Sequence, residues 1–487
     1  MPARRLTRDA GDKTFMPLGV GRRPNDPEDS RMVAKTDTPG ARTPTRSQRI
    51  PLVLAIATTI PGTLLGVAEL LHLGGPHLAP TLDALLFGLA VVGAAFLLGW
   101  AAEAAMLDIS ASLAIGALAL VAVLPEYAVG FVFAWKGGND VERFGAACKP
   151  PDGGESNCSL VLANMTGANR LLIGIGWAMV VFIAWWRWRR RGEPREGIAL
   201  DRTKSVELSF LALACAYSLT LPLKRTVTLV DALILVAIFV AYTLRISKAP
   251  AEEPHLIGPA AYVGGLPRRR RRTAVLALFG FAAVVILLVA EHFAEALVDT
   301  GAELGISEFL LVQWLAPLAS EAPELLVAGL YAWRLKTGEA LTTLVSSKVN
   351  QWTLLVGTLP VVFAIASSSL HGLPIDAQQR EELLLTAAQT VFAVAILINL
   401  TMSVKEAAAI FGLFWAQFIV GAVVPASLHG IELIAVSVVY LLLGVIMLVR
   451  NRAEFRTRLR EGFRTSYDQL EDQEPTPAGR RREARPR

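Results

Sequence analysis

The sequence predicts an all-α polytopic membrane protein of about twelve transmembrane helices. Its core is expected to be an inverted-topology repeat of five plus five helices, with extra helices added. Of the 487 residues, 53% are hydrophobic and 18% are charged, whereas soluble domains carry about 25% charged residues. Apolar runs of roughly 20 residues, long enough to cross a hydrocarbon core of ~30 Å, recur along the chain. Two runs carry the same proline–glutamate pair, Pro125-Glu126 and Pro323-Glu324.

Twelve segments have the length and apolar content of a membrane span. They are residues 51–73, 82–104, 109–135, 159–186, 205–222, 228–246, 273–297, 306–333, 340–366, 383–401, 404–426 and 429–449. The first fifty residues lack the apolar stretch of a cleavable signal and are expected to be disordered.

Changes in charge and hydrophobicity divide the chain into seven parts. They are a disordered basic N-terminal tail (1–50), an extra N-terminal helix and loop (51–81), a first repeat half (82–246), a basic cytoplasmic loop (247–272), a second repeat half (273–426), a final helix (427–450) and a charged cytoplasmic tail (451–487). The start of that last tail has the composition of a basic surface helix, but we expect a solvated segment.

Connections that are rich in lysine and arginine alternate along the chain with connections that are poor in them. Under the positive-inside rule, this places both termini in the cytoplasm and the multi-pass chain in the cell membrane; Lys224-Arg225 is a mild exception. The loop with Cys148 and Cys158 is then external, where a disulfide is permitted but not required. Cys215 lies in an apolar run and is expected to be buried. The Arg268–Arg272 run is expected to contact anionic lipid.

The basic residues lie in loops and tails, so they do not predict nucleic-acid binding. The expected partners are membrane lipid and transported cations, and the sequence leaves the oligomeric state open. We expect no enzyme activity, since the sequence shows no H-E-x-x-H, no Ser/His dyad and no nucleotide-binding G-x-x-x-x-G-K-[ST] motif. No cofactor is expected beyond a transported Ca²⁺, Na⁺ or H⁺ as ligand.

The two proline–glutamate segments are copies of one another, each followed by a helix rich in small and polar residues. The matching positions are Ile109-Ser110 with Ile306-Ser307, Pro125-Glu126 with Pro323-Glu324, Ala134-Trp135 with Ala332-Trp333, Thr166 with Ser347, Asn169 with Asn350, Arg170 with Gln351, and Gly176 with Gly357. The copies fall on the third and eighth spans, so they are predicted to cross the membrane in opposite directions. Secondary transporters commonly place substrate sites between such repeats.

Each proline is expected to break its helix, since it removes a backbone hydrogen bond. Carbonyl groups freed at Pro125 and Pro323, beside a carboxylate, make a hard-oxygen environment suited to cations. The alternative for Glu126 and Glu324 is a buried glutamate paired with a neighbouring cation, without a role in transport.

Residues 83–186 and 273–366 resemble the α-repeats of the sodium/calcium exchanger superfamily (cation/calcium antiporters). That family carries G-T-S-x-P-E on one helix and G-S-N-x-x-N on the next; here the second copy reads ASEAPE (319–324) and SSKVNQ (346–351). The resemblance implies a counter-transporter working by alternating access. It also implies a cation-binding set of carboxylates, hydroxyls and amides: Glu126, Glu324, Ser320, Glu321, Thr166, Asn169, Ser347, Asn350 and Gln351.

Two fixed cations depart from the family pattern. In the second copy, Lys348 occupies the position of the family's first asparagine, where the first copy has Gly167. In the first copy, Arg170 occupies the position of the family's second asparagine. An ammonium group can take the place of a bound monovalent cation and neutralise a carboxylate. Lys348 and Arg170 are therefore expected to act as coupling or site-neutralising residues, with proton coupling replacing part of the sodium coupling. The alternative is that they form structural ion pairs.

Three functions remain open from the sequence. The leading one is a cation antiporter that moves calcium or another cation against protons or sodium. The second is a monovalent sodium/proton exchanger on the same scaffold. The third is a transport-inactive membrane protein whose site is locked by Arg170 and Lys348.

Overall fold

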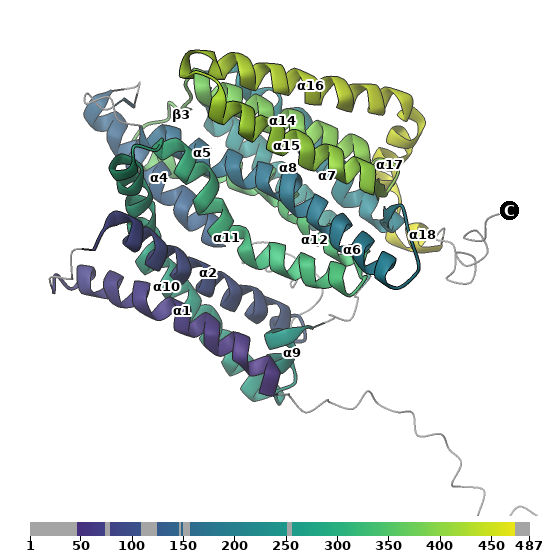
Figure 1. Cartoon of the computed structure of the whole chain (residues 1–487), viewed down its shortest axis with the longest axis horizontal. Coiled ribbons are helices and arrows are strands. Elements are labelled where there is room, and N and C mark those ends of the chain that lie inside the picture. The colour runs from purple at the N-terminus through teal and green to yellow at the C-terminus, as the bar shows by residue number, and fades with distance from the viewer. Residues whose placement is uncertain are drawn as a thin grey trace, which may run out of the picture. The chain divides into compact units, whose positions relative to one another are not determined.

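The structure is a computed structural model of the chain (Figure 1), and it describes residues 46–73, 78–108, 124–145, 148–149, 156–250 and 256–472. The helices of the first half are α1 (Arg46–Leu70), α2 (Pro80–Ala105), α4 (Leu124–Phe144), α5 (Asn157–Leu171), α6 (Ala178–Arg190), α7 (Ser205–Ser218) and α8 (Leu229–Ile246). A π-helical turn, η2 (Leu172–Trp177), joins α5 to α6, and the short 3₁₀ turns are η3 (Arg202–Lys204) and η4 (Leu221–Leu223).

The second half is also helical. Its helices are α9 (Gly258–Gly264), α10 (Arg268–Leu304), α11 (Glu308–Trp333), α12 (Thr337–Asn350), α13 (Val356–Ala366), α14 (Ala377–Leu397), α15 (Val404–Val423), α16 (His429–Arg450), α17 (Arg452–Arg464) and α18 (Tyr467–Asp472). A second π-helical turn, η5 (Gln351–Leu355), joins α12 to α13, and a 3₁₀ turn, η6 (Ala426–Leu428), precedes α16.

Each of the twelve expected spans coincides with a helix, the third from Leu124 onward because residues 109–123 lie outside the described part. Within the described residues, nine helices are long and apolar enough to cross a membrane. The three remaining expected spans, α4, α11 and α14, carry the ionisable residues of the interior, such as Glu321 and Glu382, which lower their apolar content. The all-helical polytopic class is confirmed. The count of twelve and the inverted orientation stay predictions.

Two short antiparallel strand pairs tie distant connections together. β1 (Gly197–Ala199) pairs with β4 (Thr401–Ser403), and β2 (Thr226–Val227) pairs with β3 (Leu373–Pro374). Each pair joins two connections that the span count puts on the same side of the membrane. The second strand pair places the Lys224-Arg225 turn, which is the exception to the positive-inside rule, beside a connection expected to be external.

The arginine run at the start of α10 binds a carboxylate of the protein itself. Arg271 donates to Asp108 at 2.7 and 3.0 Å, and Arg268 and Arg272 lie 3.4 and 3.2 Å from the same carboxylate. The Arg271 guanidinium holds the pKa of Asp108 at about 2, below its ordinary value. The run expected to contact lipid therefore also fastens the end of α2 to α10.

Residues 452–472, after α16, do not form a solvated tail. The expectation of a solvated charged segment is therefore wrong for these residues. Helix α17 packs on α7 because the buried Glu461 carboxylate binds Arg202, Arg458 and the Ser205 hydroxyl. In α18, Tyr467 and Leu470 are buried in the main apolar core. Residues 473–487 lie outside the described part.

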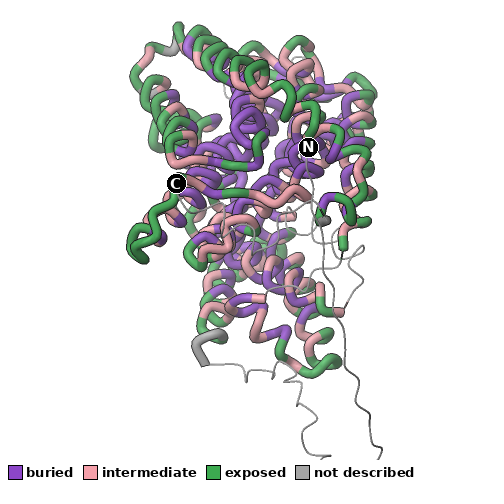
Figure 2. Tube along the Cα trace, turned by 90° about the vertical axis from the view of Figure 1, so that its right-hand side faces the viewer, coloured by how far each residue is buried: buried purple, intermediate pink, exposed green. Residues whose placement is uncertain are grey.

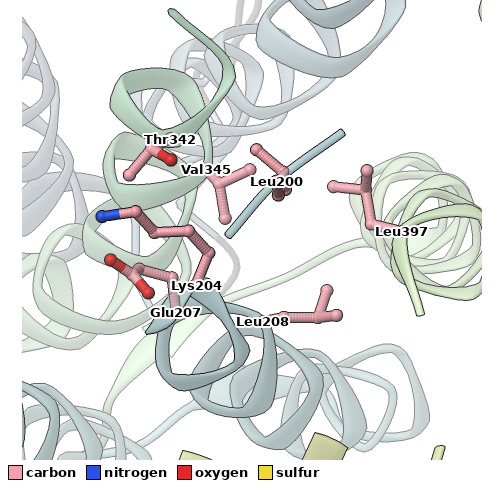
Figure 3. Close-up of a pocket in the computed structure, with 7 residues that line it drawn as sticks. All are labelled: Leu200, Lys204, Glu207, Leu208, Thr342, Val345 and Leu397. Atoms are coloured by element: carbon pink, nitrogen blue, oxygen red, sulfur yellow. The ribbon is translucent and has the colours of Figure 1, made fainter. Parts of the chain in front are cut away.

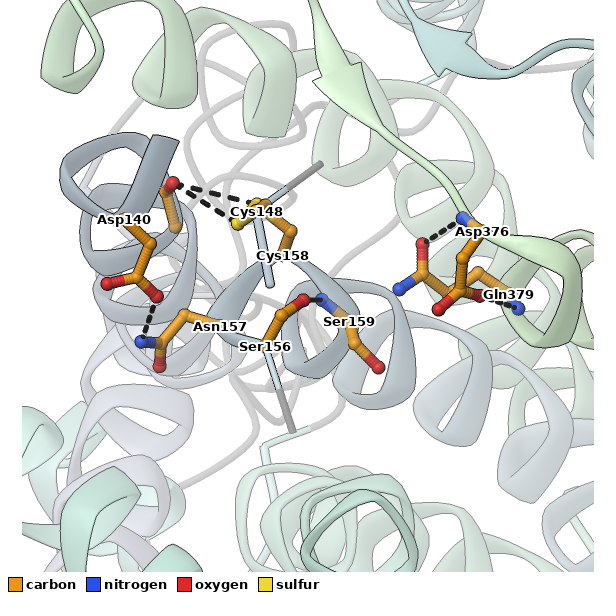
Figure 4. Close-up of a disulfide and its surroundings, with 9 residues drawn as sticks. Asp140, Cys148, Ser156, Asn157, Cys158, Ser159, Asp376 and Gln379 are labelled. Carbon is orange, nitrogen blue, oxygen red and sulfur yellow. Dashed lines mark hydrogen bonds between the residues drawn. A yellow bond between two sulfur atoms is a disulfide. The ribbon is translucent and has the colours of Figure 1, made fainter. Parts of the chain in front are cut away.

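The cysteine loop, which is expected to be external, is cross-linked in the structure. Cys148 and Cys158 form a disulfide, and nearby Asn157 donates to Asp140 at 2.6 Å (Figure 4). Cys158 begins the most enclosed part of the chain, because every residue of α5 from Cys158 to Leu171 is buried. Cys215 is buried, as expected.

Burial separates central helices from peripheral ones (Figure 2). In the 18-residue apolar stretch of the span from Asn157 to Arg190, 78% of the residues are buried, whereas the figure for α8 is 22%. Helix α5 contacts α4, α11 and α14, so its polar residues face protein on several sides. Polar side chains at this depth are expensive in a bilayer and usually mark a functional interior.

Candidate cation site

Three carboxyl groups meet between α4 and α11. Glu126 lies in the first turn of α4, whereas Glu321 and Glu324 lie one helical turn apart on α11. The exposed fraction is 1% for Glu126 and 2% for Glu321, and Glu324 is partly exposed. The Glu321 carboxyl is within hydrogen-bonding range of both other carboxyls. The two repeat copies therefore contribute to one carboxyl cluster.

Donors from the second repeat hold this cluster. The Gln351 side-chain nitrogen donates to Glu321 Oε1 at 2.7 Å and to Glu126 Oε2 at 3.4 Å. The Ser347 hydroxyl donates to Glu324. Among the described residues, Glu126 Oε1 and Glu321 Oε2 have no N–H or hydroxyl donor. Since an ionised carboxylate only accepts, a hydrogen bond between these two groups requires a shared proton.

Lys348 crosses from α12 to α5 beside this cluster. Its fully buried ammonium group donates to Asn169 Oδ1 at 2.7 Å and to the Asn169 backbone carbonyl, and it lies 5.6 Å from the centre of the Trp352 ring. Its charge acts on Glu126 and Glu321 through space, and no direct Lys348–carboxylate pair occurs within 4.0 Å in the described ranges. Lys348 thus supplies a positive charge without filling the carboxyl cluster.

Arg170 departs from the expected position beside the carboxyl cluster. It binds Glu382 of α14 at 2.6 Å and Gln417 of α15, and its guanidinium lies 5.1 Å from the Trp314 ring centre. Sequence reasoning missed this pair because Glu382 was assigned to the connection before the tenth span. The helix in fact begins at Ala377 with a capping box from Asp376, which places Glu382 inside it.

Several predicted ligand residues are satisfied by their own helices in this structure. Thr166 donates to the Leu162 carbonyl at 2.7 Å and lies 3.4 Å from the Gln313 amide nitrogen. Ser320 donates to the Ala316 carbonyl at 3.2 Å, and Asn350 is buried. Of the predicted set, the structure brings Ser347 and Gln351 directly to the carboxyls, whereas Asn169 binds Lys348 instead.

The predicted helix break at Pro323 is wrong. Helix α11 continues through both Pro317 and Pro323, although each proline removes one hydrogen bond. Pro125 lies in the first turn of α4, and the residues before Leu124 are outside the described part. The irregularity lies in the partner helices instead, as the π-helical turns η2 and η5. Such turns are frequent at functional sites.

Proline has a second effect on α11. Pro317 cannot donate to the Gln313 carbonyl, and this carbonyl lies against Gly167, where an added Cβ atom would overlap it. Gly167 is one of the two positions where the first asparagine of the family pattern is missing. Its lack of a side chain allows the close crossing of α5 and α11.

A small pocket in the described ranges (Figure 3) is lined by none of the residues of the carboxyl cluster. Its lining residues are Leu200, Lys204, Glu207, Leu208, Thr342, Val345 and Leu397. The part of the chain that the structure describes holds no group of three or more His, Cys, Asp or Glu side chains already arranged around a metal-sized space. In this conformation the carboxyl cluster does not form such a group, and Gln351 and Ser347 donate to its carboxyls.

The fold and the buried carboxyl cluster define a polytopic membrane transporter of cations. The sodium/calcium exchanger protein family model matches residues 80–248 and 274–424, so the chain belongs to the sodium/calcium exchanger family. No curated protein sequence matched the chain.

Two solved structures resemble this chain. An H⁺/Ca²⁺ exchanger, CAX, shares 40% identity with a TM-score of 0.76; the match covers 88% of this chain and 100% of that one. The Ca²⁺/H⁺ antiporter protein YfkE shares 14% identity over 81% of this chain and 99% of its own, with a TM-score of 0.51, and shows the fold alone.

Proposed function

We propose that this protein is an antiporter that exchanges calcium for protons at the Glu126–Glu321–Glu324 cluster. The observation that carries the proposal is the contact between Glu126 and Glu321. Two buried carboxyls from different repeats lie together, and their facing oxygens have no other donor in the described residues. Such a pair binds a proton when closed and offers hard anionic oxygens to a divalent cation when the proton leaves. The similar CAX structure is named as an H⁺/Ca²⁺ exchanger, which supports the same pair of ions.

Protons and calcium compete for the same carboxyls, and this competition results in exchange. Protons neutralise the carboxyls and close the cluster through Gln351 and Ser347. Calcium requires the ionised carboxylates, so it binds after the protons have left. Alternating access then moves calcium in one direction and protons in the other.

Lys348 favours protons over sodium as the second ion. Its buried ammonium group stands where the family pattern has an asparagine and supplies one positive charge near the carboxylates. When Lys348 is protonated, its positive charge opposes simultaneous occupancy by several sodium ions. The contacts of Arg170 with Glu382 and Gln417 argue against the inactive alternative, in which Arg170 locks the cluster.

Thermal unfolding of the purified protein tests the assignment of the ligands. Calcium is expected to raise the unfolding temperature at neutral pH and to lose this effect as the pH falls, because a ligand stabilises the state that binds it. Sodium at the same ionic strength is expected to have little effect. The Glu126→Gln variant should lose the response to calcium, and Glu339→Gln, which changes an exposed glutamate of α12, should keep it. Stabilisation by sodium alone would instead support the sodium/proton exchanger.

A further inference from the structure

A second buried ionisable cluster lies between α5, α14, α15 and α16, away from the carboxyls described above. Arg170 binds Glu382 at 2.6 Å, and the oxygen of the Gln417 amide accepts from Arg170. The same amide hydrogen-bonds Glu432, so its nitrogen is the donor. The exposed fractions are 2% for Arg170, 6% for Glu382, 8% for Gln417 and 9% for Glu432. We call this set the Arg170 cluster.

The Arg170 cluster contains buried polar atoms that the protein leaves unsatisfied. Glu432 Oε1 and the Tyr440 hydroxyl have no hydrogen-bond partner among the described residues. Tyr440 is 1% exposed and close enough to Arg170 to feel its charge. Native proteins bond nearly all buried polar atoms, so such an atom needs an explanation. A buried carboxylate oxygen without a donor is a place where a bound proton is favoured.

The charges of the cluster select a proton over a metal ion. With both carboxylates ionised, Glu382 and Glu432 carry two negative charges against the one positive charge of Arg170. The guanidinium repels a metal cation, and no metal-binding arrangement occurs here within the described part. A proton bound at Glu432 leaves one carboxylate and one guanidinium, which is a neutral pair. Burying the second carboxylate without neutralising its charge would carry a large desolvation penalty.

Partly exposed titratable groups lie near Glu432. Glu432 lies in the first turn of α16, beside the partly exposed His429. The carboxylate of Glu381, also partly exposed, lies against Gly430, where an added Cβ atom would be 2.7 Å from both of its oxygens. The titratable and charged groups that act on Glu432 are Arg170 from α5, Glu382 from α14 and His429 on its own helix; α15 contributes the neutral Gln417. Glu381 lies at Gly430, two residues before it.

We infer that Glu432, held by Gln417 and opposed to the Arg170–Glu382 pair, is a second proton-binding site that is distinct from the exchanger carboxyls. A proton from solvent forms an O–H bond at Glu432 Oε1, and the charge of the carboxylate changes from −1 to 0. Helix α5 links the two sites, because Arg170 directly follows Asn169, which binds Lys348. The charge state of Glu432 therefore acts on the strength of the Arg170 contacts and on the position of α5.

Infrared difference spectroscopy of the full-length protein in lipid tests this inference. The starting variant carries Glu126→Gln, Glu321→Gln and Glu324→Gln, which remove the exchanger carboxyls. Acidification is expected to produce carboxylic-acid C=O bands in this variant, and adding Glu432→Gln is expected to remove one component of them. Adding Glu339→Gln, on the exposed side of α12, should leave that component unchanged. Identical difference spectra with and without Glu432→Gln overturn the inference.

A second variant covers the case in which Glu432→Gln does not fold. Glu432→Asp retains the carboxyl, so that component is expected to shift in frequency rather than disappear, and an unshifted component counts against the inference. In otherwise unchanged protein, Glu432→Gln is expected to keep calcium–proton exchange with a flatter pH dependence. Loss of exchange in Glu126→Gln with the Glu432 band intact would separate the two sites. Failure of exchange in unchanged protein, with that band present, would reject the proposed function alone.

Discussion

Lys348 of α12 reaches across to Asn169 of α5 and donates to its side-chain oxygen at 2.7 Å. This contact joins the second helix of one repeat to the second helix of the other, close to the carboxyl cluster. It puts an ionisable amine where the family pattern has an uncharged amide. The ion preference of the protein is therefore expected to depend on this residue.

Replacing Lys348 by Asn is expected to raise the affinity for cations. At an effective dielectric constant of about 20, removing a unit charge a few ångströms away changes the binding free energy by a few kcal/mol, so an increase of at least roughly tenfold is expected. Calcium and sodium titrations of the unfolding temperature measure it. Lys336→Asn, which changes a lysine with a 34% exposed side chain, is the control. Unchanged ion selectivity in Lys348→Asn would contradict the role assigned to this charge.

Replacing Gly167 by Ala is expected to destabilise the crossing of α5 and α11. The added methyl group would overlap the backbone carbonyl of Gln313, and overpacking of this kind costs typically about 1–3 kcal/mol. Gly280→Ala in α10 is the control, because no atom lies within 4 Å of its added Cβ. The unfolding temperature should fall for the first variant and stay constant or rise for the second. Equal effects would show that the close approach is not restrictive.

Replacing Glu461 by Gln is expected to release α17 from α7. The change removes the carboxylate that Arg202 and Arg458 share, and a lost buried hydrogen-bonding partner costs about 1–3 kcal/mol. Trypsin should then cleave faster at the arginines of α17, because a detached helix is more accessible. Glu454→Gln, at an exposed position of the same helix, should be cleaved at the original rate. An unchanged rate for Glu461→Gln would mean that the ion pairs do not hold the segment.

Asp108 predicts an acid-dependent loss of stability. Its folded pKa is about 2, below the ordinary value of roughly 3.9. The contribution of its pairing with Arg271 is therefore complete above about pH 4 and is lost as the pH falls toward 2. Unfolding temperatures of wild type and Asp108→Asn should differ at pH 6 and converge as acid is added. A difference that stays constant over this range would exclude the ion pair as its source.

The membrane class and the main carboxylates could be predicted from sequence because both depend on local composition. Apolar length fixes the spans, and the repeated Pro-Glu pair draws attention to Glu126 and Glu324. The partner of Arg170 could not be predicted, since Glu382 lies 212 positions away in the chain and nothing local relates them. The continuity of α11 was also missed, because proline predicts a lost hydrogen bond but not whether packing holds both halves together. The docking of α17 depends likewise on Arg202, far away in sequence.

Flux in proteoliposomes tests the central claim most directly. Vesicles with an imposed pH gradient are expected to move calcium against the direction of proton flow, without sodium on either side. Glu126→Gln should abolish both movements, and Glu339→Gln should retain them. Calcium movement that requires sodium, or that continues in Glu126→Gln, would contradict calcium–proton exchange at the carboxyl cluster.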